Sequence, residues 1–563
     1  MFKNLIIIVT LFSGFCNVFG VGNATGETLT LHLKPLYDSF GKANSIHVSY
    51  EVVFEDNLRS DHTLNLHFDL MQNHGRKADQ IYDLMVKDQD GVVKINLPKK
   101  DAENNVIVYE AARKVNGKVT VEYTITAASP NRKGGANIDM QASGGGLTGS
   151  LISILLLQPF EKDVFVKLDW ELAEGNTAVS SFGVGNKTSL VKLSYGSLQY
   201  TQFIIGRLTM YPSPLPEKGF SVAGLGLPEE SIGNSLPQFE NVYEYLRTQF
   251  QGSPDLAFRF FFRSYPELPS SSGSAVQGDG YGSFLVCIPQ AEKLRDNEDM
   301  FALVNHEMLH VFITGLSKEW YREGIAEYLS TILPYKGKYY SDAFYLKSIN
   351  EKAANYYTNS LRLLPDSAGG KLKFSSANSW IVPYSRGFLY FANLDAKLKI
   401  LKKGSQTSVL SLAMEMEKLK RTQANDENTW VELIRKEAGE WAVKDWQDMK
   451  SGKLIIPIPG AFGDDIIPEK LKTGIFDLGF NKSGKIVKGD IIKDLIKDSN
   501  AAKAGIKEGD EVVESVDLYP LFGSFDKTLT VKIKRNKEIL SFSFIPRRGS
   551  VEGYHWVSAK SKL

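Results

Sequence analysis

The sequence predicts a multidomain α+β protein, and three observations support this prediction. Between about residues 27 and 215, apolar residues recur at every second position in many short segments, which is typical of antiparallel strands with one buried face. From there to about residue 450 the apolar spacing becomes mostly helical. The last hundred residues return to strand-like alternation around one short helix. A chain of 563 residues is long enough for roughly three or four domains.

Prolines mark the expected domain boundaries, because one group ends at Pro216 and a second group ends at Pro459. We therefore expect a leader over residues 1–20, a sandwich-like antiparallel β domain over 21–215, a mostly helical domain over 216–455, a small β domain over 456–550 and a tail over 551–563. The glycine-rich stretch from Gly134 to Gly149 is expected to be a long turn or loop, since no lysine follows it in phosphate-loop spacing.

The N-terminal segment has the three parts of a secretory signal peptide. Lys3 gives a positive start, residues 5–12 are almost wholly apolar, and small residues follow at Gly20 and Gly22. A short membrane anchor is the alternative, but the apolar run is well below the ~20 residues that a spanning helix needs. We therefore expect cleavage after Gly20, export to the periplasm or the cell exterior, and no stable membrane span.

Charge and cysteine content exclude two classes of protein. The formal net charge is +1, so the composition gives no basic surface of the kind that nucleic acids require. Of the two cysteines, Cys16 lies in the expected leader, and Cys287 would remain alone after cleavage. The mature chain is therefore expected to have no disulfide framework, and its stability must come from apolar cores, with a bound metal as a further candidate.

A histidine pair with helical spacing is the strongest chemical signal. Residues 306–310 read His-Glu-Met-Leu-His, inside a stretch without proline or glycine that favours a helix. His306 and His310 would project from the same helix face and could hold one Zn²⁺. Glu307 is one residue along and could reach a metal-bound water as a general base.

A second expected helix, near residue 320, could supply the third metal ligand. Glu323 is the candidate, and three protein ligands plus one water are the arrangement of a catalytic zinc site. Glu327 lies one helical turn further on, where it could orient a ligand histidine from behind or could be a surface residue. The alternative for the whole pattern is a helix face whose two histidines are buried without a metal.

At these residues the sequence resembles the gluzincin zinc peptidases. The similarity is greatest to the glycyl aminopeptidases that carry a PDZ domain, and the aminopeptidase N type is a more distant relation. The segment from Trp320 to Tyr328 is similar to the one that carries the third zinc ligand in these families, which places that ligand at Glu323. The resemblance implies a thermolysin-like, mostly helical catalytic domain that hydrolyses peptide bonds.

A second segment carries the same resemblance. Residues 382–388 read Val-Pro-Tyr-Ser-Arg-Gly-Phe, and the tyrosine of such a segment stabilises the oxyanion in these families. That role would fall on Tyr384, with Arg386 as a further candidate. A phenol hydroxyl near a metal could stabilise developing negative charge in this way. A packed core tyrosine is the alternative for Tyr384.

The C-terminal part is similar to a PDZ domain. Leu478, Gly479 and Phe480 correspond to its carboxylate-binding loop, whose backbone N–H groups could hold the C-terminus of a peptide. The stretch between Val516 and Thr528 is short for the second PDZ helix, which forms one wall of the peptide groove. The domain is therefore expected to be either a peptide receptor or a packing module.

The stretch expected to bind the amino end of the substrate leaves three possible functions open. These aminopeptidases carry a glycine-rich strand with a glutamate for the free amine, and the corresponding stretch here includes Asp279, Gly280 and Tyr281 but no glutamate. We expect an edge strand from Gly280 to Leu285 to pair with the peptide, with Asp279 as a candidate amine ligand. An aminopeptidase is the first hypothesis. An endopeptidase and an inactive peptide-binding protein on a metal-stabilised scaffold are the alternatives.

Overall fold

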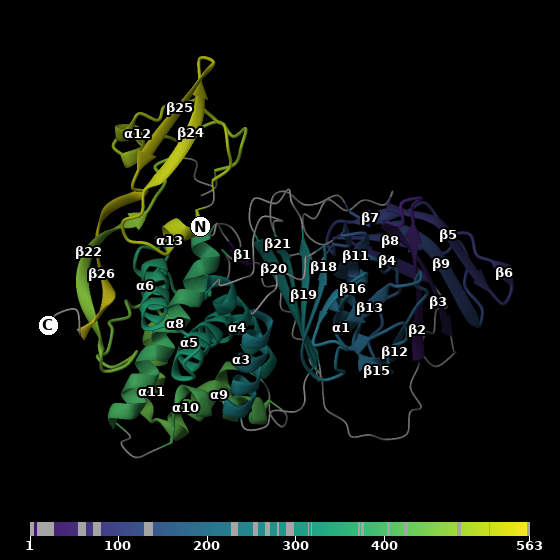
Figure 1. The fold of residues 1–563 in the computed structure, drawn as a ribbon, viewed down its shortest axis with the longest axis horizontal. Helices are drawn as coiled ribbons and strands as arrows, with labels where there is room; N and C mark the ends of the chain where they lie inside the picture. Colours follow the sequence, from purple (N-terminus) through teal and green to yellow (C-terminus); the bar gives the residue numbers. More distant parts are fainter. Residues whose placement is uncertain are drawn as a thin grey trace.

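The computed structural model has a β-rich N-terminal part, a helical part and a smaller C-terminal β part, which run from right to upper left in Figure 1. The structure describes residues 5–7, 28–53, 64–70, 80–128, 139–226, 235–250, 257–264, 271–278, 281–288, 298–313, 315–316, 318–369, 372, 377–401, 406–420, 426–480, 486–516 and 518–559. No helix within these ranges combines the length and apolar character needed to cross a bilayer.

The N-terminal part consists of three packed sheets, in the orders β15-β12-β2-β3-β9-β5-β6, β4-β8-β7 and β10-β11-β16-β13-β14. Their elements are β2 (Thr28–Tyr37), β3 (Ala43–Val53), β4 (Asn65–Asp69), β5 (Ile81–Asp88), β6 (Gly91–Val92), β7 (Lys99–Asp101), β8 (Val106–Glu110), β9 (Lys118–Thr126), β10 (Gln141–Ser143), β11 (Gly146–Ser150), β12 (Val164–Trp170), β13 (Thr177–Ser180), β14 (Gly183–Val184), β15 (Val191–Leu193) and β16 (Gln202–Gly206), with a 3-10 turn η2 (Leu151–Ser153) and a short helix α1 (Tyr195–Tyr200).

The period-two pattern predicts the buried face of this part correctly. Leu31, Val48, Val121 and Leu168, from four different strands, are all fully buried in one core. The expectation of purely antiparallel pairing is wrong at one position, because β12 pairs with β2 in parallel. Alternation along a strand reports which side chains are buried, and it is the same for both pairing directions.

The glycine-rich stretch is a β-hairpin in its described portion, and the expectation of a loop is wrong there. β10 and β11 pair antiparallel, and β11 pairs in turn with β16. A Cβ added at Gly146 would lie 2.0 Å from the Ile205 carbonyl oxygen, and one at Gly149 would lie 2.7 Å from Met140 Cα. These glycines do not form a turn, and their lack of a side chain lets neighbouring backbone segments approach closely inside a sheet.

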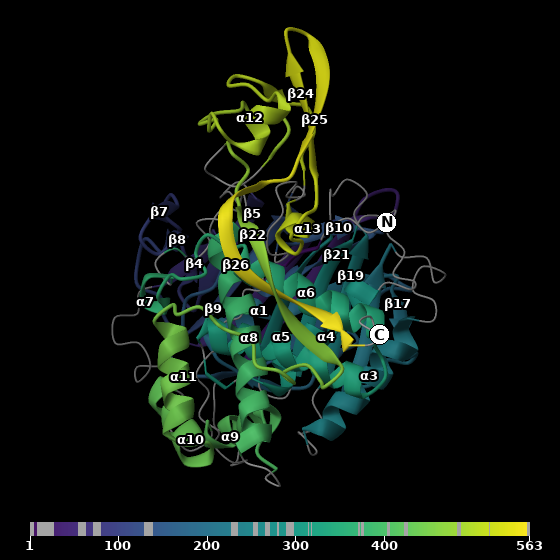
Figure 2. The same ribbon diagram turned by 90° about the vertical axis from the view of Figure 1, so that its left-hand side faces the viewer.

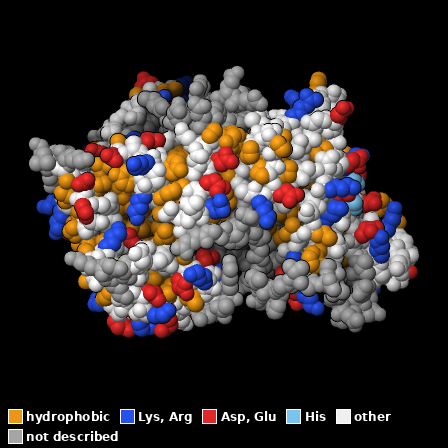
Figure 3. Space-filling view, turned by 60° about the horizontal axis from the view of Figure 1, so that its bottom comes forward, with side chains coloured by type: hydrophobic (Ala, Val, Ile, Leu, Met, Phe, Trp, Pro, Cys, Tyr) orange, Lys and Arg blue, Asp and Glu red, His pale blue; other side chains and the backbone are white. Residues whose placement is uncertain are grey.

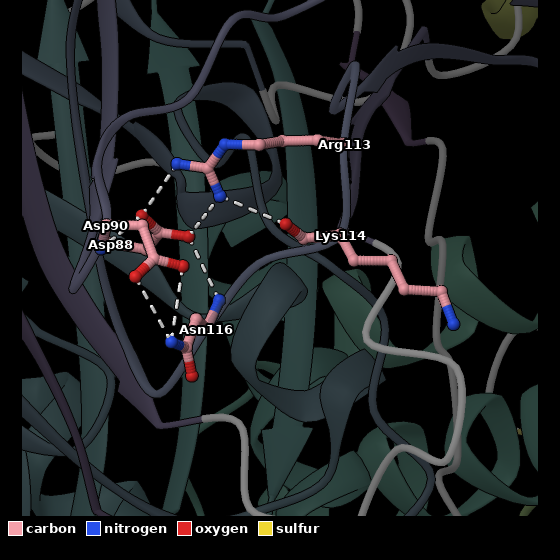
Figure 4. A network of polar contacts seen from close by, with 5 residues as sticks. All are labelled: Asp88, Asp90, Arg113, Lys114 and Asn116. Carbon is pink, nitrogen blue, oxygen red and sulfur yellow. Dashed lines mark hydrogen bonds and ion pairs between the residues drawn. The ribbon is translucent and has the colours of Figure 1, made fainter.

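An ion-pair network fixes the β5–β6 hairpin at the far end of this part (Figure 4). Asp88, whose side chain is fully buried, accepts two hydrogen bonds from the Arg113 guanidinium, at 2.5 and 2.8 Å, and one from the Asn116 backbone, at 2.9 Å. The hydrogen bond from Arg113 is the main reason that the pKa of Asp88 falls to about 2.

The helical part contains a second mixed sheet, in the order β1-β20-β21-β19-β18-β17. Its strands are β1 (Leu5–Ile7), β17 (Thr209–Tyr211), β18 (Gly219–Leu225), β19 (Ala257–Ser264), β20 (Ser271–Gly278) and β21 (Tyr281–Ile288). The sheet already includes residues 209–211, so the first domain ends slightly earlier than residue 215. The edge-strand prediction for Gly280–Leu285 is wrong, because β21 lies between β19 and β20.

Helices cover one face of this sheet, and the N-terminal part covers the other (Figures 1 and 2). Phe260 and Phe284 face the helical core, whereas Phe261 and Leu285 pack against the N-terminal part. A strand buried on both faces favours apolar residues at successive positions, and β19 has three in Phe260, Phe261 and Phe262. Its two arginines, Arg259 and Arg263, are also buried, and their guanidinium groups donate to backbone carbonyl oxygens. The helices are α3 (Ser235–Gln249), α4 (Glu298–Phe312), α5 (Glu319–Lys336), α6 (Asp342–Tyr357), α7 (Asp366–Gly369), α8 (Ala377–Leu401), α9 (Val409–Leu419), α10 (Glu427–Glu437) and α11 (Glu440–Lys450).

The C-terminal part has a long two-stranded ribbon and a three-stranded sheet, β23-β24-β25. Its elements are β22 (Ile466–Phe476), β23 (Glu511–Val512), β24 (Leu529–Arg535), β25 (Glu538–Phe544), β26 (Arg547–Ser558), α12 (Asn500–Ala504) and α13 (Tyr519–Phe522). The ribbon pairs β22 with β26 as far as Ser558, so residues 551–558 are not a separate tail. α13 is a single turn, in agreement with the short stretch expected there.

The surface carries both signs of charge in alternation. On the face shown in Figure 3, lysine and arginine side chains lie among aspartates and glutamates, with apolar side chains between them. This distribution agrees with the net charge of +1 and gives no basic stripe on that face.

Candidate metal centre

The two histidines of the His-Glu-x-x-His motif lie on α4 and point into the interior. His306 is 4% exposed and His310 is 2% exposed, and their Nε2 atoms are 3.1 Å apart. The helix forms because Val304, Met308 and Leu309 bury its remaining faces in the apolar core. One turn of α-helix separates the histidines, so both imidazoles reach the same point.

Glu323, near the start of α5, completes a triangle of ligand atoms. Its Oε2 lies 3.5 Å from His306 Nε2 and 3.3 Å from His310 Nε2. In a tetrahedral zinc site with bonds of about 2.0–2.1 Å, neighbouring ligand atoms are about 3.3 Å apart. The three observed separations bracket this value. In the described part of the chain, these three residues are the group whose ligand atoms could hold a metal ion.

An unpartnered polar atom within this buried site supports a metal. Glu323 Oε2, which faces the Nε2 atoms of both histidines, is buried without a hydrogen-bond partner among the described residues. Burial lowers the pKa of His306, but the carboxylates of Glu323, Glu327 and Glu307 outweigh it and raise this pKa to about 9. A buried set of two imidazoles and a carboxylate fits Zn²⁺, which takes nitrogen and oxygen ligands in this geometry.

Glu307 points into the same site without a protein partner. Its side chain is buried, and neither carboxylate oxygen accepts a hydrogen bond within the described residues. Burial is the main reason that its pKa rises to about 8. An uncompensated buried carboxylate is costly, so it marks a position that a ligand, water or metal is meant to share.

Glu327 lies behind His306, on the side away from Glu323. Its Oε1 is 3.6 Å from His306 Nδ1, and its Oε2 is 3.0 Å from Lys352 Nζ on α6. The side chain is 18% exposed, so the surface alternative for Glu327 does not describe this geometry. The sequence did not predict that Lys352 lies near the site, because only the packing of α6 against α5 brings it there.

Tyr384 and Arg386, both on α8, have different surroundings. The Tyr384 ring stacks on the His306 ring, with centroids 6.1 Å apart, and burial beside Glu323 raises the pKa of its hydroxyl well above the usual value. Arg386 instead donates through one terminal nitrogen to the carbonyl oxygens of Leu361, Arg362 and Leu364. We therefore do not propose an oxyanion role for Arg386.

The remaining candidate residues lie away from the metal ligands or outside the described ranges. Asp279 and Gly280 lie outside the described residues. Tyr281 is buried in the N-terminal core, where its ring contacts Phe182 at a centroid distance of 5.9 Å. Tyr281 is thus part of the contact between the two parts of the chain.

The predicted carboxylate loop of the C-terminal part is largely buried. Leu478 and Phe480 are each 4% exposed and belong to the apolar core of this part. Gly479 has a φ of +80°, and its N–H donates to Asp477 Oδ1 at 2.8 Å. This N–H is therefore already occupied within the chain.

Arg322 is a neighbour of the metal site that the sequence did not single out. Its Nε donates to Glu323 Oε1 at 3.1 Å, while Glu323 Oε2 faces the histidines. The two oxygens of one carboxylate are thus divided between the metal position and a guanidinium. The position of Arg322 next to Glu323 in the sequence did not predict this contact, since consecutive side chains on a helix point about 100° apart.

Comparison with known proteins identifies the fold. Scans against protein-family models and against curated proteins give no match. Among solved structures, an aminopeptidase N family protein from Idiomarina loihiensis matches with a TM-score of 0.68 and 13% identity, over 94% of this chain and 98% of that one. A mutant M1 zinc metallopeptidase from Deinococcus radiodurans, bound to a Tyr-Ser-Ala substrate, matches with a TM-score of 0.46 and 13% identity, over 77% of this chain and 95% of that one.

The first match extends over nearly the whole of both chains. It bears out the multidomain α+β prediction, with a β-rich region followed by a helical one, and leaves the PDZ-like assignment of the C-terminal part as a prediction. The chain therefore has the fold of an aminopeptidase N family protein.

Proposed function

We propose that this chain is a zinc metallopeptidase that hydrolyses peptide bonds, and that it acts as an aminopeptidase. The observation that carries the proposal is the triangle formed by His306, His310 and Glu323, with the unpartnered carboxylate of Glu307 beside it. The shared fold with an aminopeptidase N family protein supports the same reaction class.

The residues divide the reaction between them. A zinc ion bound by His306, His310 and Glu323 would polarise the scissile carbonyl and lower the pKa of a bound water to about 7. Glu307 accepts a proton at its carboxylate and returns it to the leaving amine nitrogen. The Tyr384 hydroxyl donates to the carbonyl oxygen as negative charge develops there.

The test is Glu307→Gln, which keeps the shape of the side chain and removes the base. We expect zinc content to be unchanged and kcat for a short peptide to fall by roughly 10²- to 10⁴-fold. Glu298→Gln, at the exposed first residue of the same helix, is the matched control and should retain activity. Hydrolysis by Glu307→Gln at the wild-type rate would refute the mechanism.

Specificity for a free amino terminus is a separate part of the proposal. The fold favours an aminopeptidase, whereas the described residues show no glutamate on β20 or β21 to bind an amine. This second observation keeps an endopeptidase as the alternative. Peptides of one sequence with free and acetylated N-termini distinguish the two, because equal cleavage of both would identify an endopeptidase.

Two further proposals concern the ends of the chain. We propose export to the periplasm or the cell exterior, supported by the signal-like sequence of residues 1–20.

We also propose that the C-terminal part is a PDZ-like module that serves as a packing element. The buried Leu478–Phe480 loop and the single-turn α13 support this role over that of an open peptide receptor. C-terminal peptides that bind it tightly in solution would contradict this.

A further inference from the structure

Lys352 places a positive charge behind one of the metal ligands. Its Nζ lies 3.0 Å from Glu327 Oε2, and Glu327 Oε1 lies 3.6 Å from His306 Nδ1. The other ring nitrogen of the histidine, Nε2, faces Glu323 Oε2 at 3.5 Å. One carboxylate on α5 therefore connects a cation on α6 to a metal ligand on α4.

The Glu327 carboxylate needs a partner to stay beside the histidine. Its side chain is 18% exposed, so it can turn towards water if nothing holds it. Of its two described contacts, the one with Lys352 is the shorter, and the 3.6 Å to His306 is longer than an ordinary hydrogen bond. Removing one member of a largely buried ion pair leaves the other charge uncompensated. Without the lysine, the carboxylate would be released from His306.

Lys352 itself is held in place from two sides. Its Nζ lies 5.6 Å from the ring centroid of Phe388, a fully buried side chain on α8, at a distance where a cation and a ring attract. Two residues before it on α6, Asn350 exchanges two hydrogen bonds with the backbone of Trp556 on β26, at 2.8 and 2.7 Å. The ammonium group is thus a fixed anchor for the carboxylate.

Charge and orientation predict opposite effects of this lysine on zinc binding. Zn²⁺ and an ammonium group repel each other, so charge alone predicts that loss of Lys352 tightens zinc binding. A carboxylate beside the second nitrogen of a ligand histidine fixes the tautomer and the ring orientation, which strengthens metal binding. If loss of Lys352 frees the carboxylate from His306, zinc binding weakens. The sign of the change therefore shows which effect is larger.

We propose that Lys352 is a positioning residue of the metal centre, which holds the Glu327 carboxylate against His306 Nδ1 and so keeps His306 Nε2 directed at the metal position. This inference rests on the metal site of the proposed function. Lys352 contacts the carboxylate and not a metal ligand, so its effect passes through Glu327. Loss of an outer partner of a ligand typically weakens metal binding by about 10- to 100-fold, and we expect roughly tenfold for Lys352.

The experiment measures the zinc dissociation constant of the full chain by competition with a chromophoric chelator. Lys352→Met keeps an unbranched apolar stem and removes the charge, and it should raise the dissociation constant roughly tenfold. In the Glu327→Gln background the same change should cause no further weakening, because no carboxylate remains to be held. Lys347→Met is the matched control on α6. Its Nζ lies 3.8 Å from Glu351 Oε1 and 5.4 Å from the Phe344 ring centroid, and this variant should bind zinc as tightly as wild type.

Thermal unfolding of the metal-free variants distinguishes a loss of zinc affinity from a loss of folding stability. If Lys352→Met does not fold, Lys352→Gln provides the same test with a side chain that can stay hydrated. Zinc binding by wild type without peptide hydrolysis would contradict the proposed function, and the zinc affinities would still decide this inference. The inference is overturned if wild type binds no zinc, if Lys352→Met binds zinc equally or more tightly, or if its loss is the same in the Glu327→Gln background.

Discussion

The glycine pair where α5 crosses α8 gives the sharpest test of how this site is built. Gly324 follows the ligand Glu323, and Gly387 lies one helical turn beyond Tyr384. A Cβ added at Gly387 would lie 2.1 Å from the Trp320 carbonyl oxygen and 2.6 Å from Gly324 Cα. Both obstacles are backbone atoms, so no side-chain rotation can relieve the clash. The Gly387→Ala substitution must therefore push the two helices apart.

The size of the displacement follows from the structure. An ordinary contact of 3.4 Å instead of 2.1 Å requires α5 and α8 to separate by about 1.3 Å. Overpacking of this kind costs about 1–3 kcal/mol of folding stability. The separation also moves Tyr384 relative to Glu323, and a 1 Å misplacement of reacting groups reduces a rate by about 100-fold. We expect both stability and kcat to fall.

Three measurements on zinc-loaded Gly387→Ala check this expectation: thermal unfolding, zinc content and kcat/KM for a short peptide. Gly196→Ala is the control, because no heavy atom lies within 4 Å of its added Cβ and alanine favours the helix α1. The reasoning is refuted if Gly387→Ala unfolds at the wild-type temperature and turns over peptide at the wild-type rate. A stable variant with reduced kcat would show that the crossing acts mainly on geometry.

Two further predictions concern separate parts of the chain. Tyr384→Phe should lower kcat by about 10²- to 10³-fold, with KM and zinc content little changed, because the hydroxyl acts only on the developing oxyanion; an equal loss in KM would indicate a binding role instead. The folded-state pKa of Asp88, about 2, lies below its ordinary value of 3.8, so its charge stabilises the fold above about pH 4 and this contribution is lost as the pH falls towards 2. The stability difference between wild type and Asp88→Asn in urea titrations should therefore shrink over that window, and a difference independent of pH would contradict the assigned pKa.

Features within a single helix or strand could be predicted from the sequence. His306 and His310 converge because helical spacing alone places them on one face, and the structure brings them together with Glu323. The buried positions of the N-terminal strands follow from alternation in the same way. Placing Glu323 and Tyr384 near the histidines needed the resemblance to a known family, because no local pattern states which helices pack together.

Features that depend on contacts between distant segments could not be predicted. The glycines of β11 indicated a loop because glycine is common in turns, whereas here they admit the neighbouring strand β16. Arg386 belonged to a segment of predicted function, yet one of its terminal nitrogens donates to carbonyl groups from a turn more than twenty residues earlier in the chain. The sequence did not predict a role for Arg322 beside the metal ligands, because only the structure shows which oxygen of Glu323 its Nε contacts.

The C-terminal part contributes to the position of Tyr384, and this explains why a packing role suits it. Ile381, one turn before Tyr384 on α8, is buried in the core of the C-terminal part, whereas the adjacent Val382 is buried in the helical core. The Phe476 N–H donates to the Thr358 carbonyl oxygen at 2.8 Å, which fastens the end of β22 beside α6. The start of α8 is therefore held from both sides. A domain that opened and closed around a peptide would loosen this support, whereas a fixed one keeps the Tyr384 hydroxyl at the site where charge develops.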